Sequence, residues 1–228
     1  MNNMFILDDI PFRADLAALR KRLRVRDGST HIETLARLVI EAEAVARPKA
    51  MYKTAYIESK DENTVIIDGI TFTSRVLRVN LDIAHRVFAY VVTCGTELDA
   101  WAHTLDDMLL RYWADTINEM ALRVAVQVFN QHLTDCYELG RTSTMAPGSL
   151  ADWPIHEQRP LFTLLGDPQA AIGVHLTDSY LMIPNKTVSG ICFPTEVDFQ
   201  SCQLCPRGKC PGRRAVYDET LYDRKYKQ

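Results

Sequence analysis

The spacing of apolar residues predicts two amphipathic helices near the N-terminus. We expect them over residues 13–23 and 31–45, because apolar side chains recur there every three or four positions. The apolar face of the second helix consists of Leu35, Leu38, Val39, Ala42 and Val45. Ser29 and Thr30 can cap this helix at its start. Arg47-Pro48 should end it, because the residue before a proline disfavours helical backbone.

The pattern then changes to one that is typical of strands. AMYKTAYIES (50–59) reads as a strand, and TVIIDGITF (64–72) reads as a hairpin that turns at Asp68-Gly69. HRVFAYVVTCG (85–95) is almost entirely apolar. We therefore predict a strand there that is buried on both faces.

The longest predicted element is a helix from about Asp106 to about Leu139, which should be the central core helix. Its apolar stripe consists of Tyr112, Trp113, Ile117, Met120, Ala121, Val124, Val128 and Phe129. Gly140 is the expected C-terminal stop, since glycine readily adopts the left-handed backbone of a helix end.

The remaining third of the chain mixes a loop, a short helix and strands. The loop RTSTMAPGSLADWP (141–154) precedes a short helix in IHEQRPLFTLLG (155–166). LTDSYLMIP and KTVSGICFP read as two strands joined at Pro184-Asn185, with Cys192 at a strand end, and a last helical segment begins near Asp218. This order predicts an α+β fold with a mixed or antiparallel sheet, a long central helix and N-terminal helices. We expect an N-terminal helical segment (1–48), an α+β core (49–190) and a cysteine-rich segment (191–228), together forming one compact unit.

Composition and charge limit the classes of function. The chain has 228 residues, 47% of them hydrophobic, which is enough for a core without disulfides. No run approaches the roughly 18 apolar residues that span a bilayer, and the start of the chain lacks the basic region of a signal peptide, so we expect no membrane partner and a cytoplasmic location. A net charge of −3 with both signs interspersed argues against nucleic-acid binding. Basic residues cluster only near the last cysteines: Arg207, Lys209, Arg213 and Arg214.

Four of the six cysteines lie close together in the sequence, in the order C-x9-C-x2-C-x4-C. Thiols clustered in a reducing compartment are more often metal ligands than bridges. The predicted ligands are Cys192, Cys202, Cys205 and Cys210. Only one CxxC pair is present, whereas zinc ribbons usually have two, so the spacing favours an iron–sulfur cluster, with zinc as the alternative. We expect the other two cysteines, Cys94 and Cys136, to be buried core thiols.

Other catalytic signatures are absent from the sequence. The six histidines are scattered without a pair at metal-ligand spacing, and there is no Gly-x-Ser-x-Gly, Walker or Gly-x-Gly-x-x-Gly motif. The loop from Met145 to Pro154 has two interpretations. It can be a rigid connector in which Asp152 caps the helix that begins near Pro154, or a loop whose backbone amides beside Gly148 hold a polar ligand.

Two segments resemble a known family. APGSLADWPIHEQRPLFTLLGD and IGVHLTDSYLMIPNKTVSG are similar to the activation, or reactivation, domain of cobalamin-dependent methionine synthase. ARPKAMYK and the long helix resemble stand-alone bacterial versions of that domain, so the similarity extends over nearly the whole chain. It implies a mixed α+β fold and a role in corrinoid chemistry, in which oxidised cobalt is returned to use by one-electron reduction and by a methyl group from S-adenosylmethionine.

The chain departs from the family at the ligand positions. The family loop reads Arg-x-x-x-Gly-Tyr; with Gly148 as the anchor, Thr144 takes the arginine position and Ser149 the tyrosine position, while Arg141 lies three positions earlier. Where the family has a tyrosine pair, this chain has Gln200, Ser201 and Cys202. The candidate binding residues for S-adenosylmethionine or a corrinoid are Arg141, Ala146, Pro147, Gly148, Ser149 and Asp152.

The cysteines and the resemblance together predict an accessory protein for the reductive reactivation of a cobalamin-dependent methyltransferase. Its partners would be a corrinoid protein, which carries the cobalamin, and an electron-donor protein, and it would not be catalytic alone. Two alternatives remain open: a zinc-stabilised docking module, and a reactivation subunit that binds S-adenosylmethionine without a redox cluster.

Overall fold

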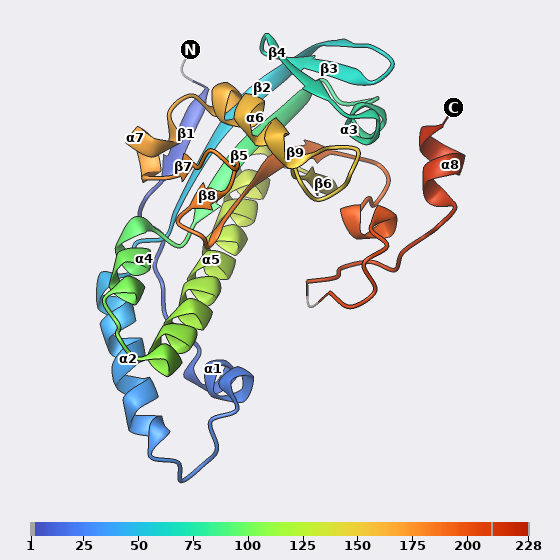
Figure 1. Cartoon of the computed structure of the whole chain (residues 1–228). Coiled ribbons are helices and arrows are strands. Elements are labelled where there is room, and N and C mark those ends of the chain that lie inside the picture. Colours follow the sequence, from blue (N-terminus) through green and yellow to red (C-terminus); the bar gives the residue numbers. More distant parts are fainter. Residues whose placement is uncertain (1–2, 211, 228) are drawn as a thin grey trace.

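An antiparallel sheet forms the centre of the protein. The computed structural model describes residues 3–210 and 212–227, and within these ranges seven strands form the sheet, in the order β4-β3-β2-β5-β9-β6 with β1 also paired to β2 (Figure 1). The strands are β1 (Met4–Leu7), β2 (Lys49–Lys60), β3 (Thr64–Ile67), β4 (Ile70–Thr73), β5 (Arg86–Thr93), β6 (Thr142–Met145) and β9 (Thr187–Pro194). Each of their pairings is antiparallel.

Helices pack on both faces of this sheet. One face contacts α1 (Leu16–Leu23), α2 (His31–Val45), α4 (Thr96–His103) and the long helix α5 (Met108–Tyr137). The other contacts α3 (Arg75–Asn80), the 3-10 turn η1 (Ile155–Glu157) with α6 (Gln158–Leu165), and α7 (Pro168–Ile172), while α8 (Leu221–Tyr226) packs against α3. The α+β prediction, with a long helix against an antiparallel sheet, is confirmed.

Strand β5 shows why both faces need cover. Val87, Ala89 and Val91 point into the core on the α6 side, and Phe88 and Val92 point into the core on the α5 side. All five are fully buried, because side chains alternate between the two faces of a strand. The prediction of a strand buried on both faces is therefore confirmed.

The hairpin prediction is also confirmed. β3 and β4 pair in register, from Thr64 with Thr73 to Ile67 with Ile70. Asp68 and Gly69 between them have positive φ angles of 45° and 77°, as a two-residue hairpin turn requires.

Other boundaries differ from the prediction. α5 ends at Tyr137, and Glu138, with φ of 49°, makes the left-handed cap, so the stop expected at Gly140 was wrong. LTDSYLMIP is not one strand: β7 (His175–Leu176) and β8 (Met182–Ile183) form a small two-stranded sheet there. The prediction missed α3, α4, β1 and β6, all eight residues or shorter, since a short element has too few positions to show a period.

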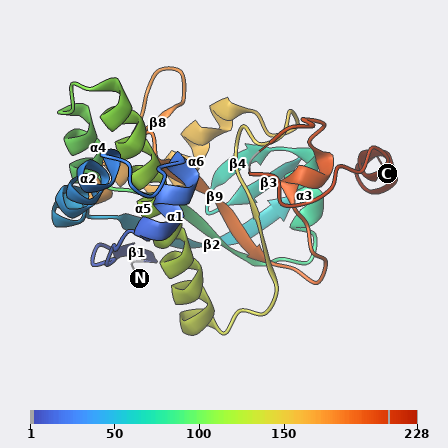
Figure 2. The same ribbon diagram turned by 90° about the horizontal axis from the view of Figure 1, so that it is seen from below.

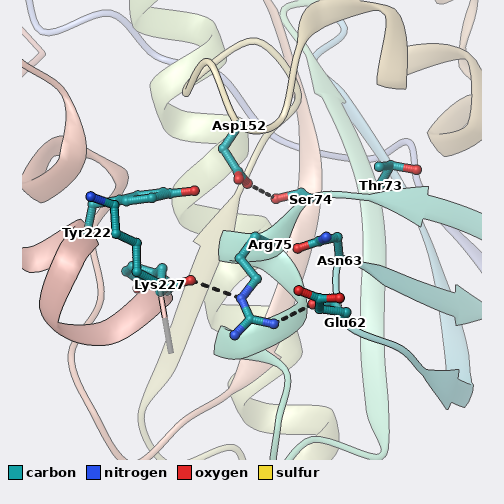
Figure 3. A pocket seen from close by; sticks show the side chains of 9 residues that line it. Glu62, Asn63, Thr73, Ser74, Arg75, Asp152, Tyr222 and Lys227 are labelled. Carbon is teal, nitrogen blue, oxygen red and sulfur yellow. Dashed lines mark hydrogen bonds between the residues drawn. The ribbon is translucent and has the colours of Figure 1, made fainter.

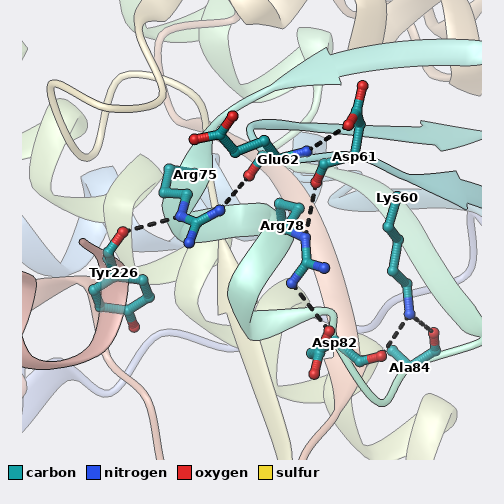
Figure 4. A network of polar contacts seen from close by, with 8 residues as sticks. All are labelled: Lys60, Asp61, Glu62, Arg75, Arg78, Asp82, Ala84 and Tyr226. Atoms are coloured by element: carbon teal, nitrogen blue, oxygen red, sulfur yellow. Dashed lines mark hydrogen bonds and ion pairs between the residues drawn. The ribbon is translucent and has the colours of Figure 1, made fainter. Parts of the chain in front are cut away.

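A network of polar contacts holds α3 against the β2–β3 end of the sheet (Figure 4). Arg78 donates to the Asp61 carbonyl (2.9 Å) and pairs with Asp82 (3.0 Å). Lys60 donates to the carbonyls of Asp82 (2.6 Å) and Ala84 (2.9 Å), and burial lowers its pKa. The start of α3 is held by Arg75, whose guanidinium donates to the carbonyls of Glu62 (2.6 Å) and Tyr226 (2.9 Å).

The C-terminal segment returns to the body of the protein through α8. Tyr226 is buried, and its hydroxyl donates to the side-chain carbonyl of Asn80 (3.1 Å); Lys225 donates to the same oxygen (2.8 Å). Figures 1 and 2 both show this segment on the opposite side of the molecule from α2 and α4. The segment between β9 and α8 (residues 195–220), called the cysteine-bearing loop below, is therefore anchored at its C-terminal end by α8. None of the helices in the described ranges is long and apolar enough to cross a membrane.

Candidate functional site

A cavity of about 590 Å³ lies where α5, the β5–β9–β6 edge and the cysteine-bearing loop meet. Its only charged lining side chain, within the part of the chain that is described, is Arg214. The other lining residues are Tyr90, Val126, Phe129, Asn130, Thr142, Ser143, Thr144, Met145, Ala146, Ser149, Val188, Ser189, Gln200, Ser201 and Gly212. A concave site with apolar walls, several hydroxyls and amides and one cation suits a small ligand with an anionic group.

Two aromatic rings form one wall of this cavity. Tyr90 on β5 and Phe129 on α5 lie with ring centroids 5.0 Å apart. Burial raises the pKa of the Tyr90 hydroxyl, and the nearby positive charge of Arg214 acts in the opposite direction. The aromatic wall and the cation are therefore close enough to act on the same ligand.

Because Gly190 has no side chain, there is space beside it for the hydroxyl group of Tyr90. The two residues are paired across β5 and β9, and a Cβ added at Gly190 would lie 3.1 Å from the Tyr90 hydroxyl oxygen and in collision with the Met145 carbonyl oxygen. Its φ is ordinary, so the need for glycine here is one of space. This gives a physical reason for the glycine of the KTVSG segment.

The Pro147-Gly148 turn is a rigid structure that also reaches the cavity. The Ser149 N–H donates to the Ala146 carbonyl (3.1 Å), and the Gly148 N–H donates to the Trp153 carbonyl (2.7 Å). Trp153 is fully buried, and its indole N–H donates to Glu157 (3.3 Å). These contacts make the turn a well-held connector between β6 and η1. Ala146 and Ser149 also line the cavity, whereas Pro147 and Gly148 build the turn that presents them.

Asp152 lies at a different place. Its carboxylate accepts hydrogen bonds from the Ser74 hydroxyl and the Val76 N–H (3.0 Å), at the start of α3 (Figure 3). The expected cap on the helix near Pro154 was wrong, since η1 has no side-chain cap. Asp152 lines a separate polar cavity of about 300 Å³ with Glu62 and Arg75. The structure therefore gives it a structural role, which ties the loop to α3.

Replacing Asp152 with alanine should destabilise the protein without changing ligand affinity. Loss of the two contacts at the start of α3 should cost about 1–2 kcal/mol and lower Tm by roughly 3–6 °C, measured by thermal unfolding. Asp178→Ala is the matched control, because Asp178 is exposed and lies outside both cavities. A loss of ligand affinity at unchanged Tm would instead mean that Asp152 binds the ligand.

Arg141 is also placed outside the cavity. Its guanidinium donates to the Glu196 carbonyl (2.9 Å), and its own carbonyl accepts from the Thr195 N–H (3.0 Å). It therefore bridges the end of β9 to the start of β6. Its expected role in ligand binding stays a prediction with no support from this geometry.

The cysteine-bearing loop is organised by Arg213. Its guanidinium donates to the carbonyls of Cys202 (3.1 Å), Cys205 (3.0 Å) and Ala215 (3.1 Å), and to that of Arg207. At the start of the loop Phe199 is buried, and its N–H donates to Ser143 (3.3 Å). The loop is therefore held by buried Phe199 at its start, by buried Tyr226 after its end, and by the Arg213 guanidinium between them.

The four clustered thiols occupy two environments. Cys202, Cys205 and Cys210 are half-buried in the loop, whereas Cys192 is buried in β9 on the α5 side of the sheet. Burial raises the pKa of Cys192 to about 11, against a hydrogen bond with Thr142, while the Arg214 N–H, which donates to the Cys202 sulfur (3.4 Å), lowers the pKa of Cys202. Metal ligation needs thiolates, so Cys202 is suited to it and Cys192 is the weakest member of the set.

The arrangement as described is not a closed metal site. Within residues 3–210 and 212–227, no group of three or more cysteine, histidine, aspartate or glutamate side chains is placed to hold a metal ion. The centre of the loop holds the Arg213 guanidinium instead. The four-cysteine site therefore stays a prediction from spacing.

The remaining two thiols, Cys94 and Cys136, also differ in their exposure to solvent. Cys94 is buried, as predicted, and burial raises its pKa to about 12. Cys136 is exposed on α5, with its sulfur 3.6 Å from His132, so the expectation of a core thiol was wrong there. It lies in the last turn of α5, which ends at Tyr137.

These pKa shifts predict the order in which the thiols are alkylated. At pH 8, in chelator-treated protein, Cys202 should react with iodoacetamide well before Cys192 and Cys94, because only the thiolate reacts and burial protects the other two. Mass spectrometry after a short pulse would measure the order. Faster labelling of Cys192 would contradict the environment described for it.

The structure is that of an α+β protein with a cavity between a long helix and the edge of an antiparallel sheet. A solved structure with this fold is the crystal structure of the MetH reactivation domain bound to AdoHcy (S-adenosylhomocysteine). The TM-score is 0.60 at 15% sequence identity, over 87% of this chain and 81% of that one. No protein-family model and no curated protein matches the chain.

Several positions singled out by the sequence lie on the cavity, and others there were missed. Thr144, Ser149, Gln200 and Ser201, at which the chain departs from the family pattern, all line it. Tyr90, Phe129 and Asn130 carry no signal in the sequence beyond the strand and helix patterns to which they belong. The signal that could have found Arg214 was its place in the basic cluster beside the cysteines.

Proposed function

We propose that this protein is an accessory factor for the reactivation of a cobalamin-dependent methyltransferase. The observation that carries the proposal is the cavity at the α5–sheet edge, in a fold that resembles the MetH reactivation domain. In such a role the protein would dock on a corrinoid partner and hold a small ligand near the cobalt. The cobalt of the partner's cofactor carries the chemistry, and this protein supplies binding and orientation.

A ligand of the S-adenosylmethionine type fits the cavity. About 590 Å³ is within the range of small-molecule sites. The Tyr90 and Phe129 rings offer a surface for a purine base. The hydroxyls of Thr144, Ser149 and Ser201 can hydrogen-bond to polar groups of the ligand. The resemblance to a domain bound to AdoHcy supports the same ligand class.

The corrinoid, which the partner would hold, would supply a cobalt that accepts one electron from a donor protein and the methyl group from the sulfonium of S-adenosylmethionine, with AdoHcy as the leaving group. The residues of this chain would hold the sulfonium ligand by its ends and leave its methyl group exposed to the partner.

The four clustered cysteines would serve as ligands of a redox cofactor. We propose that Cys192, Cys202, Cys205 and Cys210 take up an iron–sulfur cluster; such a cluster, when bound, supplies one-electron transfer at low potential. The support is the spacing of the thiols, and the lowered pKa of Cys202, to which the Arg214 N–H donates. The loop that carries three of them also forms a wall of the ligand cavity.

Metal and acid-labile sulfide analysis of protein purified without oxygen tests the redox part. About four iron and four sulfide per chain, with a broad absorbance that bleaches on reduction, is the expected result. About one zinc and no sulfide would make the loop a structural element, because zinc is redox-silent. The protein would then be a docking or ligand-binding subunit without a cluster.

A further inference from the structure

We infer that Arg214 is the anion-recognising residue of the cavity, and that it pairs with the carboxylate of an amino-acid-type ligand. The inference rests on the proposed function for the ligand class and adds the residue that reads its charged end. It assigns part of the ligand site to the cysteine-bearing loop, far along the chain from the Pro147-Gly148 turn.

Charge is the first argument. Arg214 is the only charged side chain on the cavity, and no aspartate or glutamate lines it, among the residues described. The guanidinium of Arg214 makes no ion pair with any carboxylate of that same part of the chain. An unpaired guanidinium beside hydroxyl and amide groups is suited to bind a carboxylate through two parallel hydrogen bonds.

Position is the second argument. The backbone N–H of Arg214 donates to the Cys202 sulfur, and the neighbouring Arg213 is fixed to the carbonyls of Cys202 and Cys205. These contacts hold the backbone at Arg214 beside the cavity. Its side chain is exposed, and within residues 3–210 and 212–227 no carboxylate pairs with it that would compete with a ligand.

The third argument is that neither Thr144 nor Arg141 provides a positive charge in the cavity. Thr144, on β6, carries no charge, and Arg141 is engaged with the Glu196 carbonyl outside the cavity. Among the described residues, a ligand carboxylate in this cavity would therefore meet one cation, and it comes from the cysteine-bearing loop and not from β6. Gln200, Ser201 and Gly212 of the same loop line the cavity beside it.

Isothermal titration with two ligands isolates the carboxylate. AdoHcy has the amino-acid group, and 5′-methylthioadenosine has the same nucleoside and thioether without it. In Arg214→Gln we expect affinity for AdoHcy to fall roughly 10- to 100-fold, while affinity for methylthioadenosine stays within about 2-fold of wild type. Arg214→Lys should restore part of the loss, because lysine retains the charge but not the two-pronged geometry.

Arg207→Gln is the matched control, since it removes the same charge from the same loop at a side chain that does not line the cavity. It should bind both ligands as wild type does. Equal loss of both ligands in Arg214→Gln, or wild-type AdoHcy binding by it, would overturn the inference. So would a carboxylate-dependent loss in Arg141→Gln alone.

Two outcomes separate this inference from the proposed function. Wild-type protein that binds AdoHcy and methylthioadenosine equally well would keep the cavity as a nucleoside site and remove the role of Arg214. Wild-type protein that binds neither ligand would remove the ligand class of the proposed function, and the inference would fall with it.

Discussion

Gly190→Ala should destabilise the protein and close its ligand cavity at once. The added methyl group would collide with the Met145 carbonyl oxygen on β6 and approach the Tyr90 hydroxyl to 3.1 Å on β5. Because the Met145 contact is with backbone, rotation of a side chain cannot relieve it. We expect a loss of about 3 kcal/mol in the free energy of unfolding and a Tm lower by roughly 10 °C, measured by urea and thermal unfolding.

The same variant should also bind AdoHcy more weakly than wild type. Binding is measured at a temperature at which the variant is fully folded, so that unfolding does not contribute to the loss of affinity. Tyr90 would have to leave its place beside Phe129. Gly140→Ala is the matched control: its φ is ordinary, and a Cβ there meets nothing within 4 Å. If Gly190→Ala unfolded and bound ligand like Gly140→Ala, the described packing of β5, β9 and β6 would be incorrect.

The second large effect concerns the loop cysteines. Cys202→Ser and Cys205→Ser should each reduce iron and sulfide from about four per chain to near zero, because a serine oxygen does not replace a thiolate in such a site. Both residues lie in a segment that Arg213 holds together, so the substitutions should leave the fold intact. Anaerobic purification with iron and sulfide assays would measure the effect.

Cys136→Ser provides the control for this experiment. Cys136 is exposed and belongs to α5, not to the loop, so the protein should keep its full iron content when this residue is replaced. Circular dichroism and Tm would show whether a variant that lost iron had also unfolded. Full iron content in both Cys202→Ser and Cys205→Ser would mean that these thiols do not bind the metal.

The long and strongly periodic elements were predictable from the sequence. The apolar stripes of 31–45 and 106–139, and the two-faced run at 85–95, correspond to α2, α5 and β5. Each predicted element has enough turns or alternations to show its period without any tertiary information. The Asp68-Gly69 turn was predictable because its positive φ angles need those residue types.

The short elements and the cavity were not predictable in the same way. β6 has four residues, and its place at the edge of the sheet depends on pairing with β9, some fifty residues later. The cavity joins β5, α5, β6 and the cysteine-bearing loop, so no local pattern reports it. Asp152 illustrates the difference: its neighbours in sequence suggested a local cap, and its partners are Ser74 and Val76.

The cysteines show a related limit. The sequence identified a cluster of thiols near basic residues and placed Cys192 at a strand end, but it could not show that the Cys192 side chain is buried on the α5 side of the sheet. That burial depends on how β9 pairs with β5 and β6. It makes Cys192 the residue whose participation in a metal site most needs a direct test.

The most direct test of the account is a methyl-transfer assay with a corrinoid partner. Methionine synthase that lacks its own reactivation domain and holds cobalamin as Co(II) would be mixed with this protein, a low-potential reductant and methyl-labelled S-adenosylmethionine. The account predicts that methylcobalamin forms on the partner, followed by its absorbance and the bound label, at a rate that rises with the concentration of this protein. Formation at the same slow rate with and without the protein, across corrinoid partners from the same source, would contradict a role in reactivation.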